Sequence, residues 1–123
     1  MDGSSGTGAL SHYNKETRPW GDFERFTLNE QSTVKIITVT EGEEFSLQTH
    51  EHRDEFWHII RGTGTVYLND IESAAKAGDS FYCPRGTKHR AHGAAGGLTF
   101  LEIAFGDFDE SDITRLEDKY GRA

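Results

Sequence analysis

Short segments in which apolar and polar residues alternate dominate the chain between residues 34 and 105. Alternation with a period of two, or a short apolar run between turn residues, is typical of β-strands. The strands predicted in this way are 34–40, 45–50, 56–61, 64–69, 80–83, 89–92 and 98–105. The pattern therefore indicates a fold built almost entirely from strands.

Residues that favour turns stand between the predicted strands. They recur at spacings typical of an antiparallel sandwich or jelly roll, at Gly42, Gly62, Asn69-Asp70, Gly78-Asp79, Pro84-Arg85-Gly86 and 93–97. A small antiparallel jelly-roll barrel is therefore the expected fold class.

The beginning of the chain differs from this central part. Residues 1–11 are rich in glycine and serine, and we expect a flexible tail, either native or left by the expression vector. A single folded domain is expected over residues 12–123, and Pro19 and Gly21 predict a turn near its start.

The end of the chain is expected to form a short C-terminal helix. Asp112 is a suitable N-cap and Gly121 a suitable end. Between them, Ile113, Leu116 and Tyr120 are spaced so that they would share one helical face.

Length and charge exclude several classes of protein. A chain of 123 residues forms one domain, and 21 acidic against 13 basic residues argue against a nucleic acid partner. No apolar run reaches the roughly 20 residues of a spanning helix, and the N-terminus lacks the apolar segment of a signal peptide, so no membrane association is expected. The single cysteine, Cys83, excludes an internal disulfide and favours a cytoplasmic location. We expect Cys83 to be a buried structural thiol.

One stretch carries the residues of a metal site. In an extended strand alternate residues share a face, so Gln48, His50 and His52 are expected to point the same way. A turn after His52 would bring Glu55 back toward them. Imidazoles, an amide oxygen and a carboxylate suit a borderline divalent ion, and His89 supplies a further nitrogen later in the chain.

The spacing of these residues resembles the two motifs of the cupin superfamily. The first cupin motif is matched by Gly42, Gln48, His50, Glu55 and Gly62, with Gln48 where most cupins carry a histidine. The second is matched by Gly78, Pro84, Gly86 and His89, with Gly93 in place of an asparagine.

The resemblance implies one divalent metal ion, with zinc as first choice and Mn, Fe, Ni or Co as alternatives. The motif register selects Gln48, His50, Glu55 and His89 as ligands, whereas strand alternation leaves His52 as a competitor for Gln48. A cupin whose site stays empty is the alternative to metal binding. His58 and His92 lie on the opposite faces of their predicted strands, and we expect them to be satisfied or solvated histidines.

A narrower resemblance covers nearly all of residues 17–122. The chain is similar to the C-terminal cupin domain of type II mannose-6-phosphate isomerases, a domain often fused behind a mannose-1-phosphate guanylyltransferase. The matching segments include Arg18-Pro19-Trp20-Gly21, Val34-Lys35, 47–53, Glu55 with Trp57, His89-Arg90, and Tyr120-Gly121-Arg122. It departs from the family at Glu41, Phe56, Gly93 and Ala104.

This resemblance implies interconversion of mannose 6-phosphate and fructose 6-phosphate through a cis-enediolate. A base must take a proton from C2 and return it to C1, and Glu102, Lys88 and His52 are the candidates. Arg53 and Arg90 are the candidates to bind the phosphate.

Other functions and assemblies stay open at this point. A different sugar isomerase or epimerase, a sugar-binding module without turnover, and a mononuclear iron dioxygenase would all use a similar ligand set. A homodimer is expected because the segment around Trp20 and the predicted terminal helix are apolar.

Overall fold

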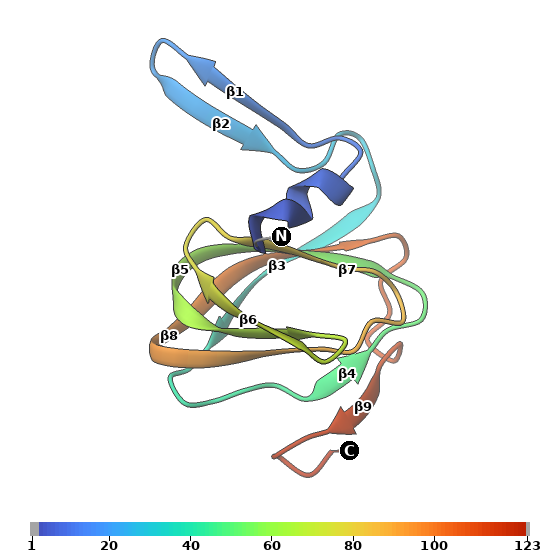
Figure 1. Ribbon diagram of the computed structural model, residues 1–123. Coiled ribbons are helices and arrows are strands. Elements are labelled where there is room, and N and C mark those ends of the chain that lie inside the picture. The colour runs from blue at the N-terminus through green and yellow to red at the C-terminus, as the bar shows by residue number, and fades with distance from the viewer. Residues whose placement is uncertain (1–2, 123) are drawn as a thin grey trace.

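The computed structural model describes residues 3–122 as a barrel of antiparallel strands with a projecting hairpin (Figure 1). A 3-10 helix, η1, precedes the strands at Gly3–Ala9. The strands are β1 (Asn14–Arg18), β2 (Gly21–Arg25), β3 (Ser32–Val39), β4 (Leu47–Thr49), β5 (Asp54–Leu68), β6 (Ile71–Lys76), β7 (Ser80–Cys83), β8 (His89–Phe105) and β9 (Thr114–Glu117).

The long strands β5 and β8 form the centre of the barrel. They pair with each other antiparallel from Asp54↔Phe105 to Leu68↔His89. One end of β5 pairs with β7 and the other with β6, while β8 pairs with β3 along one half and meets β4 at His89. Each long strand therefore belongs to both halves of the barrel.

Bulges allow β5 to bend from one half of the barrel to the other. The register with β8 shifts between Ile59 and Arg61 and again between Gly62 and Gly64. Gly62 has a φ of 85°, and a Cβ there would lie 2.1 Å from the carbonyl oxygen of Gly97. Only glycine fits this bend, which accounts for the glycine that ends the first motif.

The core fills the half of the barrel around the middle of β5 and β8. Trp57 and Phe100 are fully buried, with ring centroids 4.8 Å apart, and Ile59, Val66 and Leu98 pack in the same cluster. Cys83 belongs to this cluster, and burial raises the pKa of its thiol well above the usual value. It is the buried structural thiol that was expected.

Between residues 34 and 105 the expected strands and turns are largely confirmed, with two differences. Each long strand, β5 and β8, is continuous where two shorter strands were expected. The strand β6 was missed because its sequence lacks apolar alternation. It follows a tight turn at Asn69 and Asp70, whose φ angles of 47° and 70° match the type of turn that joins hairpin strands.

The prediction of a C-terminal helix is wrong. Residues Thr114–Glu117 form β9, which pairs antiparallel with β4, because the exposed edge of β4 offers backbone partners that a helix would leave unused. Beyond β9, the Asp118 carboxylate accepts hydrogen bonds from the amides of Tyr120 and Arg122. Such local side-chain bonds compete with helix formation.

The N-terminal segment also differs from expectation. Residues Gly3–Ala9 were expected to be flexible, but they form η1, which lies against β7, with Gly6 packed on the backbone of Ser80 and Phe81. Residues 1–2 of the expected tail lie outside the described part of the chain. The next residues form the β1–β2 hairpin, whose turn contains Pro19, as expected.

The β1–β2 hairpin projects from the barrel (Figure 1), and Trp20 in its turn is 74% exposed. This exposed aromatic side chain supports the expected homodimer, whereas the other ground for it, the terminal helix, is lost. Homodimer formation stays a prediction. Among the described residues, no helix is long and apolar enough to cross a membrane.

Candidate metal centre

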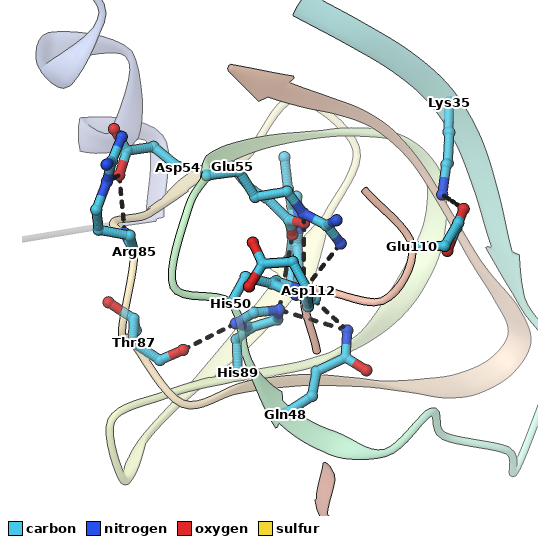
Figure 2. A network of polar contacts seen from close by, with 12 residues as sticks. Lys35, Gln48, His50, Asp54, Glu55, Arg85, Thr87, His89, Glu110 and Asp112 are labelled. Atoms are coloured by element: carbon cyan, nitrogen blue, oxygen red, sulfur yellow. Dashed lines mark hydrogen bonds and ion pairs between the residues drawn. The ribbon is translucent and has the colours of Figure 1, made fainter. Parts of the chain in front are cut away.

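Three buried side chains converge at one end of the barrel interior. His50 follows β4, Glu55 lies at the start of β5 and His89 begins β8. Their ligand atoms lie within 4.8 Å of one another (Figure 2). The loop of the second motif is joined to the first, because the Gly86 amide donates to the His50 carbonyl at 2.8 Å. The structure thus brings together the residues that the motif spacing selected.

Backbone carbonyls orient both histidine rings. The Nδ1–H of His50 donates to the Asp112 carbonyl at 2.6 Å, and that of His89 donates to the Thr87 carbonyl at 2.9 Å. These bonds leave both Nε2 atoms as acceptors, 3.4 Å and 3.6 Å from the carboxylate oxygens of Glu55. Outer hydrogen bonds of this kind are typical of histidines that bind metals.

Gln48 completes the group on the side of β4. Its amide nitrogen lies 3.4 Å from Nε2 of His50 and 3.5 Å from Nε2 of His89, while its oxygen accepts from the Ser46 hydroxyl. A half-turn of the amide exchanges the two atoms and directs the oxygen to the histidines. Gln48 therefore lies beside the two histidines, and its role as the fourth ligand stays a prediction.

Arg53 is buried against the same ligand atoms. Its Nε donates to Glu55 Oε2 at 2.9 Å and its Nη2 lies 3.1 Å from His50 Nε2. The Asp109 carbonyl accepts from Nη1, and the Phe108 ring lies 4.4 Å from the guanidinium carbon. A cation bound by Glu55 and His50 would compete with Arg53 for these two atoms.

The two buried glutamates have opposite pKa shifts. Burial alone would raise the pKa of Glu55, but His89, His50 and Arg53 outweigh it, so the pKa is lowered. Glu102 on β8 is buried beside the negative Glu55, and burial and this charge raise its pKa to about 8. Glu55 is thus ionised at neutral pH while Glu102 is mostly protonated and hydrogen-bonds to Glu55.

A cavity of about 260 Å³ adjoins Glu102 and the ligand cluster. It is lined by Gln48, Arg53 and Glu102, together with Lys35, Ile37, Phe45, Glu110, Ile113 and Arg122. The cavity therefore places polar and charged groups next to the ligand cluster, as a small polar substrate requires.

The structure places His52 away from the ligand cluster. The chain leaves β4 after Thr49, and the Asp112 carboxylate accepts hydrogen bonds from the amides of Glu51 and His52. This bend ends the strand alternation on which the expectation for His52 rested. His52 is exposed and lines a different, acidic depression with Glu51 and Asp109.

Lys88 and Arg90 also form ion pairs outside the ligand cluster. The Lys88 ammonium lies 3.1 Å from both carboxylate oxygens of Asp70, at the β5–β6 turn. Arg90 pairs with Glu44 and Glu117 and donates to the Phe45 carbonyl. Neither side chain lines the cavity beside Glu102.

His58 and His92 point away from the centre, as expected. His58 is hydrogen-bonded to the Ser80 hydroxyl at 2.7 Å, and its ring centroid lies 5.1 Å from that of Phe26. His92 is half-buried beside Glu43, a residue of the β3–β4 loop. Neither belongs to the described group of residues that could hold a metal.

The chemistry of the donor set fits a divalent metal ion. Two imidazoles whose Nε2 atoms face Glu55, a carboxylate and an amide are suitable ligands for zinc and its neighbours in the first transition row. Burial lowers the pKa of His89, which keeps this imidazole neutral and able to bind a metal at neutral pH.

Sequence reasoning missed two contributions to the site. The Asp112 carbonyl orients His50, but backbone acceptors carry no sequence signal. Arg122 lines the cavity from the end of the chain, and nothing in the local pattern of the tail indicates where it lies.

The raised pKa of Glu102 predicts how stability depends on pH in the metal-free protein. Between pH 6.5 and 8 folded Glu102 keeps a proton that it loses above about 4.5 when unfolded, so stability falls as pH rises. His89, whose pKa is lowered from 6.5, acts in the opposite direction, but most of its unfolded form has lost the proton by pH 7, so Glu102 dominates there. We expect a decline of about 1 kcal/mol per pH unit near pH 7.

Urea unfolding in the presence of a chelator measures this decline. Glu102→Gln should remove it, because the amide does not titrate. An equal decline in the variant would show that another group is responsible.

The fold and the paired motifs define a cupin. The structure is similar to Pac13 from Streptomyces, described as a nucleoside dehydratase, with a TM-score of 0.64, 18% identity and 89% of each chain covered. A cupin protein from Bacteroides fragilis matches with a TM-score of 0.57 and 21% identity over 67% of this chain and 72% of that one. These likenesses establish the fold alone.

The chain belongs to the mannose-6-phosphate isomerase C-terminal family, whose sequence model matches residues 5–118. It is 36% identical over 114 residues to the mannose-1-phosphate guanylyltransferase ManC of Salmonella typhimurium, covering 90% of this chain and 24% of that protein. It is 38% identical over 107 residues to the alginate biosynthesis protein AlgA of Pseudomonas aeruginosa, covering 85% and 22%. The chain thus spans about a quarter of the length of these relatives.

Proposed function

We propose that this chain is a metal-dependent isomerase that interconverts mannose 6-phosphate and fructose 6-phosphate. The observation that carries the proposal is the convergence of His50, Glu55 and His89 beside a buried Glu102. The match to the mannose-6-phosphate isomerase C-terminal family supports the choice of substrate.

Glu102 is the candidate that the geometry favours as the base. The reaction removes a proton from C2 and returns one to C1 through a cis-enediolate, so one group must accept and then donate a proton. A carboxyl group with a pKa of about 8 exchanges protons readily near neutral pH. Glu102 also lines the cavity, whereas Lys88 and His52 do not.

His50, Glu55, His89 and Gln48 would hold the metal ion, with zinc as first choice. When bound, the ion would act as a Lewis acid on the sugar oxygens. The protein's own part is to orient both rings so that their Nε2 atoms face Glu55, through the carbonyls of Asp112 and Thr87, and to keep Glu55 ionised through the charges around the carboxylate.

Arg53 stays a candidate to bind the phosphate, since it lines the cavity. Its guanidinium would have to leave Glu55 and His50 to do so. Arg90 is tied to Glu117 and the Phe45 carbonyl, so the geometry does not support the same role for it. A cytoplasmic location is part of this proposal, supported by the bacterial biosynthetic relatives.

A coupled assay of the purified protein tests the proposal. The protein is loaded in turn with Zn²⁺, Mn²⁺, Fe²⁺, Ni²⁺ and Co²⁺, and fructose 6-phosphate is measured after addition of mannose 6-phosphate. Turnover that disappears with a chelator and returns with the metal is expected. Sugar phosphate binding without turnover under any metal would contradict the isomerase and favour a sugar-binding module.

A further inference from the structure

Cationic side chains gather at the cavity although the chain as a whole carries a net charge of −8. Lys35, Arg53 and Arg122 all line it. Arg53 is buried and bonded to Glu55, whereas the side chains of Lys35 and Arg122 are 38% and 49% exposed. Arg122 is paired with the Asp118 carboxylate through two contacts, so Lys35 is the cation with the weaker partner. An acidic protein that concentrates cations in one cavity favours an anionic ligand there.

Lys35 faces the cavity because of its place in the sheet. It lies directly opposite Glu102 in the β3–β8 register, and opposite residues of an antiparallel pair share a face. Figure 2 shows Lys35 extending from β3 at the side of the ligand cluster, with its ammonium toward Glu110. The Nζ atom also lies 4.4 Å from the centroid of the Phe108 ring.

The ion pair between Lys35 and Glu110 is weak. The ammonium is 3.2 Å from Glu110 Oε1, and the side chains of Lys35 and Glu110 are 38% and 78% exposed. Ion pairs with this exposure contribute little to stability, since water competes for both partners. A ligand anion of higher charge could therefore replace the Glu110 carboxylate without disturbing the fold.

We propose that Lys35, with Arg122 beside the same cavity, forms an anion subsite that binds the phosphate of a phosphorylated sugar. The inference rests on the proposed function, because the sugar oxygens would then face the His50, Glu55 and His89 centre. When no ligand is present, the Glu110 carboxylate pairs with the Lys35 ammonium, and the phosphate displaces it on binding. Lys35 therefore favours phosphate binding, whereas Glu110 competes with it.

Calorimetric titration of the zinc-loaded protein with mannose 6-phosphate tests the subsite. Lys35→Met should weaken binding about 10-fold, the loss of one charge-assisted contact at a partly exposed site. Glu110→Gln should tighten binding about 3-fold because it removes the competing carboxylate. Lys76→Met is the matched control, since Lys76 forms a similar surface pair with Asp79 and neither residue lines the cavity, so the affinity of this variant should not change.

Equal weakening by Lys35→Met and Glu110→Gln would overturn the inference, because it would show that their pair is structural. Lys35→Arg keeps the charge and should retain affinity, and its failure to do so when folded would also contradict the subsite. Free mannose should bind all variants equally. Lys35-dependent binding without isomerisation would refute the proposed function alone, whereas isomerisation unaffected by Lys35→Met would refute the subsite alone.

Discussion

Replacing Glu102 with glutamine should lower kcat for mannose 6-phosphate by about 10²- to 10⁴-fold, the contribution typical of a general base. The amide has nearly the same shape as the protonated carboxyl group, and it still offers a hydrogen bond to Glu55, as Glu102 does. The metal content of the variant should therefore be unchanged. Steady-state kinetics and metal analysis of the same preparation measure both quantities.

A matched control is Glu72→Gln, which makes the same chemical change on the exposed face of β6. It should leave kcat unaltered. Glu102→Asp keeps an ionisable group one methylene further from the substrate and should retain part of the activity. A Glu102→Gln variant with full kcat would remove Glu102 from the mechanism.

Replacing His89 with alanine should weaken metal binding by more than about 100-fold, more than the loss of an outer hydrogen-bonding partner costs. The change removes one of two buried imidazoles and leaves Glu55 with one fewer neighbour. Competition with a chromophoric chelator measures the affinity, and elemental analysis measures the occupancy.

His92→Ala is the control for this change, because His92 lies on the same strand but outside the ligand group. It should bind metal as the unaltered protein does. Circular dichroism of both variants shows whether the fold is retained. Full metal occupancy in a folded His89→Ala variant would mean that the second motif supplies no ligand.

The ligand cluster could be predicted from sequence because its members lie in or beside strands, where spacing determines direction. Gln48 and His50 are two residues apart at the end of β4, and Glu55 and His89 lie at strand starts opposite them. The same reasoning failed for His52, since the Asp112 carboxylate binds the preceding backbone and bends the chain out of the strand. A contact from 60 residues away leaves no trace in local spacing.

The tail was mispredicted for a related reason. Its apolar residues fit one face of a helix, but the edge of β4 is open and β9 pairs with it. Tertiary pairing therefore overrode local propensity.

The position of Arg53 was predicted only in part, because a residue in a turn can face inward or outward, and its contact with Glu55 depends on how β5 begins.

The contacts of Asp112 also show that the candidate metal centre depends on the C-terminal tail. Its carbonyl holds His50 in one tautomer, its carboxylate fixes the adjacent loop, and the nearby Asp109 carbonyl binds Arg53. A version shortened before residue 109 would keep the buried core of β5 and β8, yet His50 would be free to place its proton on either nitrogen. Domain boundaries chosen for expression or fusion must therefore follow the hydrogen bonds of the tail rather than the edge of the hydrophobic core.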